Sequence, residues 1–461
     1  MTSAVGAGHP LYPPTVAPSA EPLSMGKFLI RGVRNPLLAM PQAAYEEDIV
    51  AFKRWTRPVF WAMAPELVET ILVKRADVFQ KSPVEKRVFR RTLKDGVLSA
   101  EGALWRWQRR TMAPLFRPAE ILQYVPRMAK PAEDLLARWR ASPQGSVQAI
   151  DDDMIETTFA VIALTMLQGG AAREAALINE ATASTLAHIS WEIIYGILGL
   201  PLWVPHPASW LMKRQAARLR GAVGDIIARR QADGGSGGDD LLGSLLAARD
   251  PETGAPMTKE QLINNLLTLL EAGHETTSRA LTWTLYLLAR APDWQEAVRA
   301  EVASVCGSRP IEGRDIQALT ITQQVLKESM RLYAPVPLMS RQALATIELG
   351  GMEVTAGSVV ILPIFCIHRH KTLWRDPGRF DPTRFTPERE AAYPRGQFMP
   401  FGAGPRVCLG SSFAMAEATV ILASLVRGAR FDWDGRHTPE PVSRVTLQPR
   451  GGMPLRVTTL P

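Results

Sequence analysis

The sequence contains few cysteines and no long uninterrupted apolar run. Three cysteines among 461 residues, none spaced as Cys-x-x-Cys, cannot form a disulfide framework, so we expect a protein of the reducing cytoplasm. The most apolar stretch, residues 191–212, is broken by Pro201, Pro205 and Pro207, whereas a membrane span needs roughly 20 apolar residues without such breaks. This stretch predicts two helix ends joined by an apolar loop, which either packs in the core or covers a ligand entrance. We therefore expect no transmembrane anchor, and the first 25 residues lack the features of a signal peptide.

Other absences narrow the classes of function. The sequence has no phosphate-binding glycine loop, no internal repeat, and no flavin or iron–sulfur signature. The net charge of +8 is small for this length and no nucleic-acid recognition motif accompanies it, so nucleic acid is not an expected partner. Apolar residues make up 46% and charged residues 21%, which is typical of a folded globular protein.

The order of the expected elements indicates the fold class. Strand-like runs come first, then many helices, then strands again, and a last long helix follows. This order favours a mostly α-helical protein with small β-sheets, the α+β class, because alternating βαβ units are absent. The expected divisions are a flexible Pro-rich N-terminal arm (1–27) and a single domain (28–461), with a β-rich portion at about 45–64 and 336–365 and a helical portion at about 65–335 and 410–427.

One expected helix carries a polar interruption. Thr258 and Gln261 form a capping-box pattern, and leucines then recur for about 30 residues, which corresponds to a helix on the order of 45 Å long. Its middle reads Ala-Gly-His-Glu-Thr-Thr (272–277), and glycine there costs about 1 kcal/mol relative to alanine. The interruption is either a tolerated kink or a groove where a small molecule approaches the backbone. In the second case, Glu275 and Thr276 would handle protons.

The strongest local signal surrounds Cys408. The segment 401–410 (FGAGPRVCLG) places Cys408 at or just before the N-terminus of the last long helix, close to Arg406. Backbone N–H groups and positive charge at such a position favour a thiolate and lower the thiol pKa. From the residues alone, Cys408 could be a buried structural cysteine, a nucleophile or a metal ligand. The segment offers neither a histidine base nor further zinc ligands, whereas a single thiolate suffices to bind iron.

These residues resemble a known family. Phe401, Gly404, Arg406, Cys408 and Gly410 match every signature position of the heme-binding loop of the cytochrome P450 superfamily. Further matches follow in the family's order, and the resemblance covers roughly residues 45 to 455. They are Trp105 and Arg109 of the family's C helix, 272–277 of its I helix, Glu328 and Arg331 of its K helix, and Arg384 in the segment 374–385, where Thr383 stands in place of the frequent glutamate.

The resemblance implies a heme b site, with the long central I helix over the heme and the cysteine loop below it. Cys408 is then the iron ligand, and Thr276 and Glu275 deliver protons during oxygen activation. The implied structural network is Glu328, Arg331 and Arg384. The implied heme-binding residues are Trp105, Arg109, Ala272, Gly273, Arg341, Phe401, Gly404, Arg406 and Gly410.

The resemblance also implies a function. It is that of a monooxygenase, which inserts one oxygen atom from O2 into an apolar or amphipathic small molecule such as a fatty acid, terpenoid, steroid or aromatic compound. Electrons from NAD(P)H would arrive through a separate ferredoxin and its reductase, or through a flavodoxin-type donor, and we expect a monomer. The tentative pocket walls are Val97, Leu98, Val336 and Leu338, with the stretch 193–203 nearby.

Charge gives the expected donor weak support. Residues 81–140 contain 14 Lys and Arg against 6 Asp and Glu, which would attract an acidic carrier. These arginines could equally bind heme propionates or solvate a helix. Two alternative functions are a peroxide-driven heme-thiolate peroxygenase and a heme- or ligand-binding protein without turnover. The presence of Glu275 and Thr276 argues against both.

Overall fold

The structure, a computed structural model, describes residues 10–19, 25–52, 58–167, 172–201, 203–232 and 240–461. Its helices are α1 (Met25–Arg34), α2 (Pro65–Glu69), α3 (Pro83–Leu93), α4 (Gly102–Met112), α5 (Pro118–Leu122), α6 (Val125–Ala141), α7 (Ile150–Leu167), α8 (Ala172–Ile197), α9 (Ser209–Ala232), α10 (Leu241–Ala247), α11 (Lys259–Arg290), α12 (Pro292–Cys306), α13 (Thr320–Leu332), α14 (Ile364–Ile367), α15 (Pro387–Ala391) and α16 (Ser411–Gly428). Its strands are β1 (Ile49–Phe52), β2 (Val59–Ala62), β3 (Phe79–Lys81), β4 (Ser146–Ala149), β5 (Met339–Ala343), β6 (Ile347–Leu349), β7 (Met352–Val354), β8 (Val359–Leu362), β9 (Ala429–Asp432), β10 (Glu440–Ser443), β11 (Leu447–Arg450) and β12 (Pro454–Thr459). The expected α+β class is confirmed.

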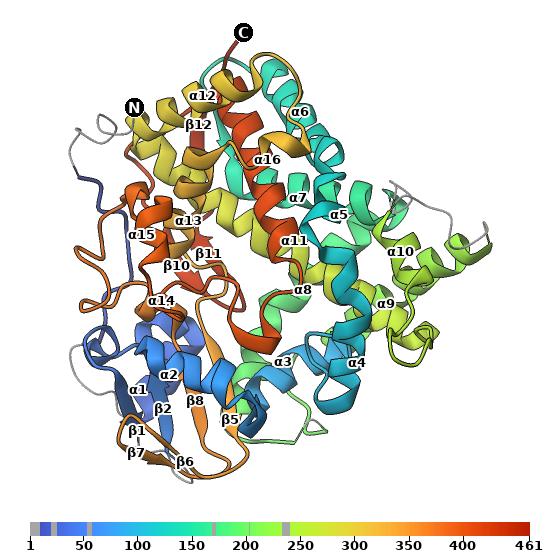
Figure 1. Ribbon diagram of the computed structural model, residues 1–461, viewed down its shortest axis with the longest axis vertical. Coiled ribbons are helices and arrows are strands. Elements are labelled where there is room, and N and C mark those ends of the chain that lie inside the picture. Colours follow the sequence, from blue (N-terminus) through green and yellow to red (C-terminus); the bar gives the residue numbers. More distant parts are fainter. Residues whose placement is uncertain (1–9, 20–24, 53–57, 168–171, 202, 233–239) are drawn as a thin grey trace.

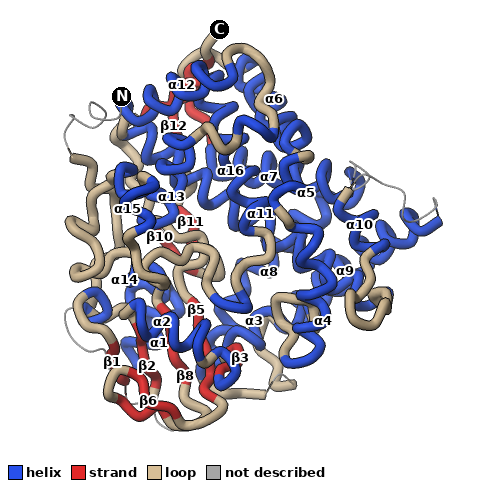
Figure 2. Tube along the Cα trace, viewed as in Figure 1, coloured by secondary structure: helices blue, strands red, loops and turns tan. Residues whose placement is uncertain are grey.

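The strands gather mainly at one end of the molecule. A five-stranded sheet has the order β1-β2-β8-β5-β3, so the early and the late strand-like segments share one sheet (Figures 1 and 2). β2 and β8 run parallel, whereas the other pairs in this sheet are antiparallel. Helices and three smaller sheets, β4-β12-β9, β10-β11 and β6-β7, form the rest of the molecule. The expected β-rich portion 336–365 ends a few residues early, because β8 ends at Leu362 and the short helix α14 follows Pro363, which cannot donate a ladder hydrogen bond.

Helix α11 is the longest helix of the described residues and crosses the middle of the molecule (Figure 1). Both hydrogen bonds of the expected capping box form: Gln261 N donates to Thr258 Oγ1 at 3.3 Å, and Thr258 N donates to Gln261 Oε1 at 2.8 Å. The helix is buried along most of its length and packs against α7, α9, α13 and α16. Its polar centre is therefore held rigidly inside the protein rather than at a surface kink.

Part of the expected N-terminal arm is packed against the domain. Phe380 N donates to Leu11 O at 2.9 Å, Tyr333 Oη donates to Pro14 O at 2.6 Å, and Val16 is buried. These contacts hold residues 10–19 of the expected arm against the domain. Residues 1–9 and 20–24 of the expected arm lie outside the described residues.

The apolar stretch 191–212 forms the end of α8, a connecting loop and the start of α9, as expected. Ile193 faces an internal cavity, whereas the side chains of Trp203 and Trp210 are 82% and 70% exposed, so the stretch is not simply core. Arg87 of α3 joins it to the domain by donating to Glu192 at 2.7 Å and to Leu200 O at 2.7 Å. Among the helices that the structure describes, none has the length and apolarity needed to cross a membrane.

Candidate functional site

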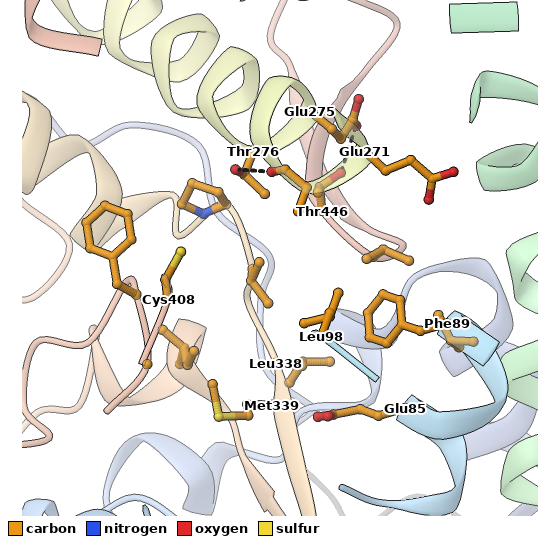
Figure 3. A pocket seen from close by; sticks show the side chains of 18 of the residues that line it. Glu85, Phe89, Leu98, Glu271, Glu275, Thr276, Leu338, Met339, Cys408 and Thr446 are labelled. Carbon is orange, nitrogen blue, oxygen red and sulfur yellow. Dashed lines mark hydrogen bonds between the residues drawn. The ribbon is translucent and has the colours of Figure 1, made fainter. Parts of the chain in front are cut away.

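A large internal cavity lies between α11 and the loop that carries Cys408. Its volume is about 680 Å³, and most of its lining is apolar. Its walls include parts of α3, α4, α8, α11 and β5 and residues 400–402 and 406–410 (Figure 3). The four wall residues expected from the sequence all line it: Val97, Leu98, Val336 and Leu338.

Cys408 projects into this cavity from a tight loop. Cys408 N donates to Phe401 O at 2.9 Å, and α16 begins three residues later at Ser411. The side chain is accessible, but the accessible surface is inside the cavity. The expected lowering of the thiol pKa is wrong for the protein alone, because burial raises the pKa of Cys408 and outweighs the lowering by the Gly410 N–H and Arg109. The nearby cation is Arg109, whereas Arg406 was expected in that role.

Two glycines of this loop, Gly404 and Gly410, differ in what an added Cβ atom would meet. Gly404 has a φ of +72°, and a Cβ there would overlap the backbone carbonyl of Leu72. Gly404 is not among the residues that line the cavity, and its small size is required by the close approach of the Leu72 backbone. Gly410 does line the cavity, and a Cβ there would meet no atom within 4 Å. The part of the cavity next to Gly410, two residues after Cys408, is therefore open.

Cationic side chains border the same cavity. Arg109, Arg341 and Arg406 each donate a hydrogen bond to a backbone carbonyl oxygen, at 2.7, 2.8 and 2.9 Å. Arg341 also lies 3.6 Å from Glu85, and the Arg406 guanidinium stacks 4.3 Å over the Trp105 ring. Burial lowers the pKa of Arg109 and of Arg406, as expected for cations held away from water. An anionic group placed against these side chains would therefore be stabilised.

The centre of α11 faces the cavity opposite Cys408. Thr276 Oγ1 donates to Ala272 O at 2.8 Å, and Figure 3 shows the hydroxyl on the Cys408 side of the helix. Ala272 and Gly273 also line the cavity. A Cβ at Gly273 would overlap the end of the Ile162 side chain of α7, which would have to shift to make room. The polar interruption thus places one hydroxyl over the cavity without breaking α11.

Glu275 is fixed by a network of hydrogen bonds. Its Oε1 accepts from Arg279 at 3.0 Å, from Thr446 at 2.9 Å and from Gln448 at 3.1 Å. Burial raises the pKa of Glu275, but Arg279, His274 and Thr446 together outweigh burial, and the pKa falls below its ordinary value. Glu275 is therefore an ionised group bound to the β10–β11 hairpin.

A second carboxyl group of α11, that of Glu271, was not expected from the sequence. It lies one helical turn before Glu275 and lines the cavity, and burial raises its pKa to about 8. Glu417 of α16 lines the cavity as well, and burial raises its pKa well above the ordinary value, with partial compensation by the neighbouring Thr277. The i, i+4 spacing of two glutamates in an apolar helix was the available signal for Glu271.

The expected charged network forms below α11, outside the cavity lining. Arg331 donates to both carboxylate oxygens of Glu328 at 2.7 Å and to His368 O at 2.8 Å, and the Arg384 Nε lies 3.5 Å from Glu328. Burial lowers the pKa of His368 to about 3, so its neutral ring accepts a hydrogen bond from Met399 N at 3.0 Å. The network therefore reaches the segment directly before the cysteine loop.

Comparisons with known proteins agree with this geometry. A family model described as Cytochrome P450 matches residues 22–455. Cyclooctatin synthase from Streptomyces melanosporofaciens is 32% identical over 441 residues, covering 96% of this chain and 93% of that protein. Cyclooctat-9-en-7-ol 5-monooxygenase from the same organism is 31% identical over 399 residues, covering 85% and 84%. The crystal structure of the cytochrome P450DA heme domain has a TM-score of 0.83 at 27% identity, covering 97% of this chain and 99% of that chain.

Proposed function

The chain belongs to the cytochrome P450 family, and from this premise we propose that it oxygenates a cyclic, mainly apolar molecule of the terpenoid type inside the cavity described above. It is a P450 monooxygenase that uses heme, O2 and, through a reductase, NAD(P)H. The observation that carries the proposal is the position of Cys408, which faces an apolar cavity opposite the Thr276 hydroxyl.

The residues around the cavity fit a heme. Cys408 offers a single sulfur as iron ligand, and Arg109, Arg341 and Arg406 offer cationic partners for the two propionates, with Trp105 beside them. The open space at Gly410 leaves room for a flat ring. When bound, the heme supplies oxygen activation, which no protein side chain performs. Phe401 and Ala272 line the same cavity and complete the proposed heme-binding set.

The protein side of the reaction is the control of protons and water. The Thr276 hydroxyl donates to Ala272 O, and its remaining acceptor capacity can hold an ordered water inside the cavity. Glu275 lies on the preceding position of the helix but is directed to Thr446 and Gln448. We propose that Thr276 positions the proton-carrying water and that the Glu275 carboxylate accepts protons on the hairpin side and passes them to this water.

The substrate class rests on the chemistry of the cavity and on the relatives. The cavity must hold the heme as well as the substrate, and its mostly apolar walls suit a hydrocarbon skeleton. The name of one relative, Cyclooctat-9-en-7-ol 5-monooxygenase, denotes oxygenation of a cyclic alcohol. This name favours a terpenoid over the fatty acids and aromatic compounds that the sequence left open.

We propose that electrons come from a separate acidic ferredoxin-type donor. Arg106 lies within α4, and Arg117 lies directly before α5. Both residues are exposed, and neither has an ion pair among the residues that the structure describes. Exposed cations without internal partners favour association with an acidic carrier. We expect the coupling to weaken as salt concentration rises.

The experiment is reconstitution with heme followed by turnover. We expect the reduced protein with carbon monoxide to show the thiolate-type absorption band, and we expect NADPH, ferredoxin and reductase to support oxygenation of terpenoids from a library. Cys408→Ala should abolish the thiolate-type band, and retention of that band would refute the ligand assignment. Turnover with hydrogen peroxide but none with the donor system would favour the peroxygenase alternative.

A further inference from the structure

One oxygen of a carboxyl group in the cavity lining is buried without a partner in the described structure. This oxygen is Glu271 Oε1, and no ion pair with Glu271 occurs among the described residues. The Thr182 hydroxyl of α8, which lines the same cavity, is also buried without a partner, as are Thr277 Oγ1 and the carboxyl oxygens of its neighbour Glu417. Buried polar groups in native proteins nearly always have partners, so orphaned groups in a ligand cavity indicate a polar atom of the ligand.

The position of Glu271 separates it from the reaction centre. In Figure 3 its side chain extends from α11 away from Cys408, above the side of the cavity where Phe89 and Leu98 lie, whereas Thr276 is on the Cys408 side. Glu275 is already bound to Arg279 and the hairpin. Glu271 is therefore placed to contact the end of a guest that is remote from the sulfur.

We propose that the Glu271 carboxyl group is a polar subsite that binds a hydroxyl group at the remote end of the substrate. This subsite rests on the proposed function and deepens it, because it defines the substrate as an alcohol with an apolar skeleton. A carboxylic acid both donates and accepts a hydrogen bond, and so does an alcohol, so one pair of groups can satisfy all their polar atoms. The reaction that supplies the substrate must then be one that has already introduced this hydroxyl group.

The chemistry of the cavity favours an alcohol over an ammonium group. An isolated carboxylate in an apolar cavity is costly, and the raised pKa keeps Glu271 largely protonated at neutral pH. Binding an ammonium ion would require ionising Glu271 and removing both charges from water, and the attraction of such a buried pair often fails to offset that desolvation. A neutral alcohol requires neither step.

The test measures dissociation constants from the spin-state shift of the heme band in the full-length heme-loaded protein. The probes are two matched series: cedrane, cedrol and 8-aminocedrane, and 5α-androstane with its 3β-alcohol and 3β-amine. For each protein, the preference is the hydrocarbon Kd divided by the alcohol Kd. We expect Glu271→Leu to lower this preference by about tenfold or more in at least one series, because it removes the only partner proposed for the hydroxyl.

Two variants make the result specific. Glu271→Gln keeps a donor and an acceptor of the same shape, and we expect it to retain the preference within about threefold. Glu260→Gln, on the first turn of the same helix and exposed, should leave the preference unchanged. Equal preferences in the wild type, Glu271→Leu and Glu271→Gln would overturn the subsite, as would failure of both alcohols to bind the wild type.

Four other outcomes also bear on the subsite or on the proposed function. An amine that binds the wild type at least tenfold tighter than its alcohol, with the advantage lost in Glu271→Gln, would overturn the assignment to alcohols. Increased peroxide formation in Glu271→Gln with an unchanged alcohol preference would identify a proton donor and overturn the subsite. Loss of the preference in Glu271→Leu, with the thiolate-type spectrum intact, would support it. A wild type without that spectrum would refute the proposed function itself, which separates the two failures.

Discussion

The raised pKa of Glu271 predicts an unusual dependence of stability on pH. The unfolded chain releases this proton near the ordinary pKa of 4.5, whereas burial raises the pKa to about 8 in the folded protein. Between these values the folded state binds one more proton than the unfolded state, so stability falls as pH rises. The total loss is roughly 5 kcal/mol at 1.36 kcal/mol per pH unit. Glu271→Gln cannot ionise and should not show this loss.

The size of the effect can be worked out for one experiment. Between pH 5.5 and pH 8.5, the wild type should lose about 3 kcal/mol relative to Glu271→Gln. Unfolding entropy is about 2.1 cal/mol/K per residue, so for 461 residues 1 kcal/mol corresponds to about 1 °C in Tm. We therefore expect Glu271→Gln to melt only slightly above the wild type at pH 5.5 and about 3 °C further above it at pH 8.5. Differential scanning calorimetry at matched heme content measures this difference.

The contributions of other charged groups to the pH dependence of stability should cancel when the wild type is compared with Glu271→Gln. Both proteins retain the remaining charged residues of the cavity: Lys81, Glu85, Arg109, Glu275, Arg341, Arg406, Glu417 and Arg444. Glu260→Gln is the matched control on the same helix, because Lys94 lowers the pKa of Glu260 and its contribution is complete before pH 5.5. A gap between Glu271→Gln and the wild type that stays constant from pH 5.5 to pH 8.5, or that shrinks, would refute the view that Glu271 is neutral in the cavity.

Three further substitutions test the rest of the site. Thr276→Ala should divert a several-fold larger share of reducing equivalents to hydrogen peroxide, measured as peroxide per NADPH; unchanged coupling would remove Thr276 from proton handling. Glu328→Gln leaves the buried Arg331 without its carboxylate and should cost about 3–5 kcal/mol in urea unfolding, and a cost below 1 kcal/mol would contradict a buried ion pair. Gly404→Ala should sharply lower the yield of heme-loaded protein, whereas Gly435→Ala, at a similar positive φ but in open space, should not; equal yields would show that the overlap is relieved.

Much of the fold followed from local patterns. The capping box at Thr258 and the recurring leucines predicted α11, and the glycines and proline before Cys408 predicted the loop and the helix after it. These features are readable because a helix start and a tight turn depend on neighbouring residues. The packing of residues 10–19 could not be predicted from the sequence, because it depends on Tyr333 and Phe380, which are more than 300 positions away.

The pKa values and the surroundings of the site residues were harder to predict from the sequence than the residues themselves. The sequence indicated a lowered thiol pKa at Cys408 from its helix N-terminus, but burial has the larger effect in the folded protein. Gly404 was expected among the heme-binding residues, and a Cβ there would overlap the Leu72 carbonyl, which the sequence did not indicate. In both cases the surroundings of the residue depend on segments that spacing alone does not bring together.

Glu271 and Glu275 show how one helix can hold two carboxyl groups in different charge states. They lie on successive turns of α11, but Glu275 meets Arg279 and the hairpin while Glu271 meets an apolar cavity. The first environment lowers the pKa and the second raises it to about 8. Paired acids whose surroundings separate their pKa values generally have different tasks. Here an ionised group stays bound to the protein network and a neutral group faces the guest, so Glu271 can recognise a hydroxyl group away from the sulfur while Glu275 holds α11 to the hairpin.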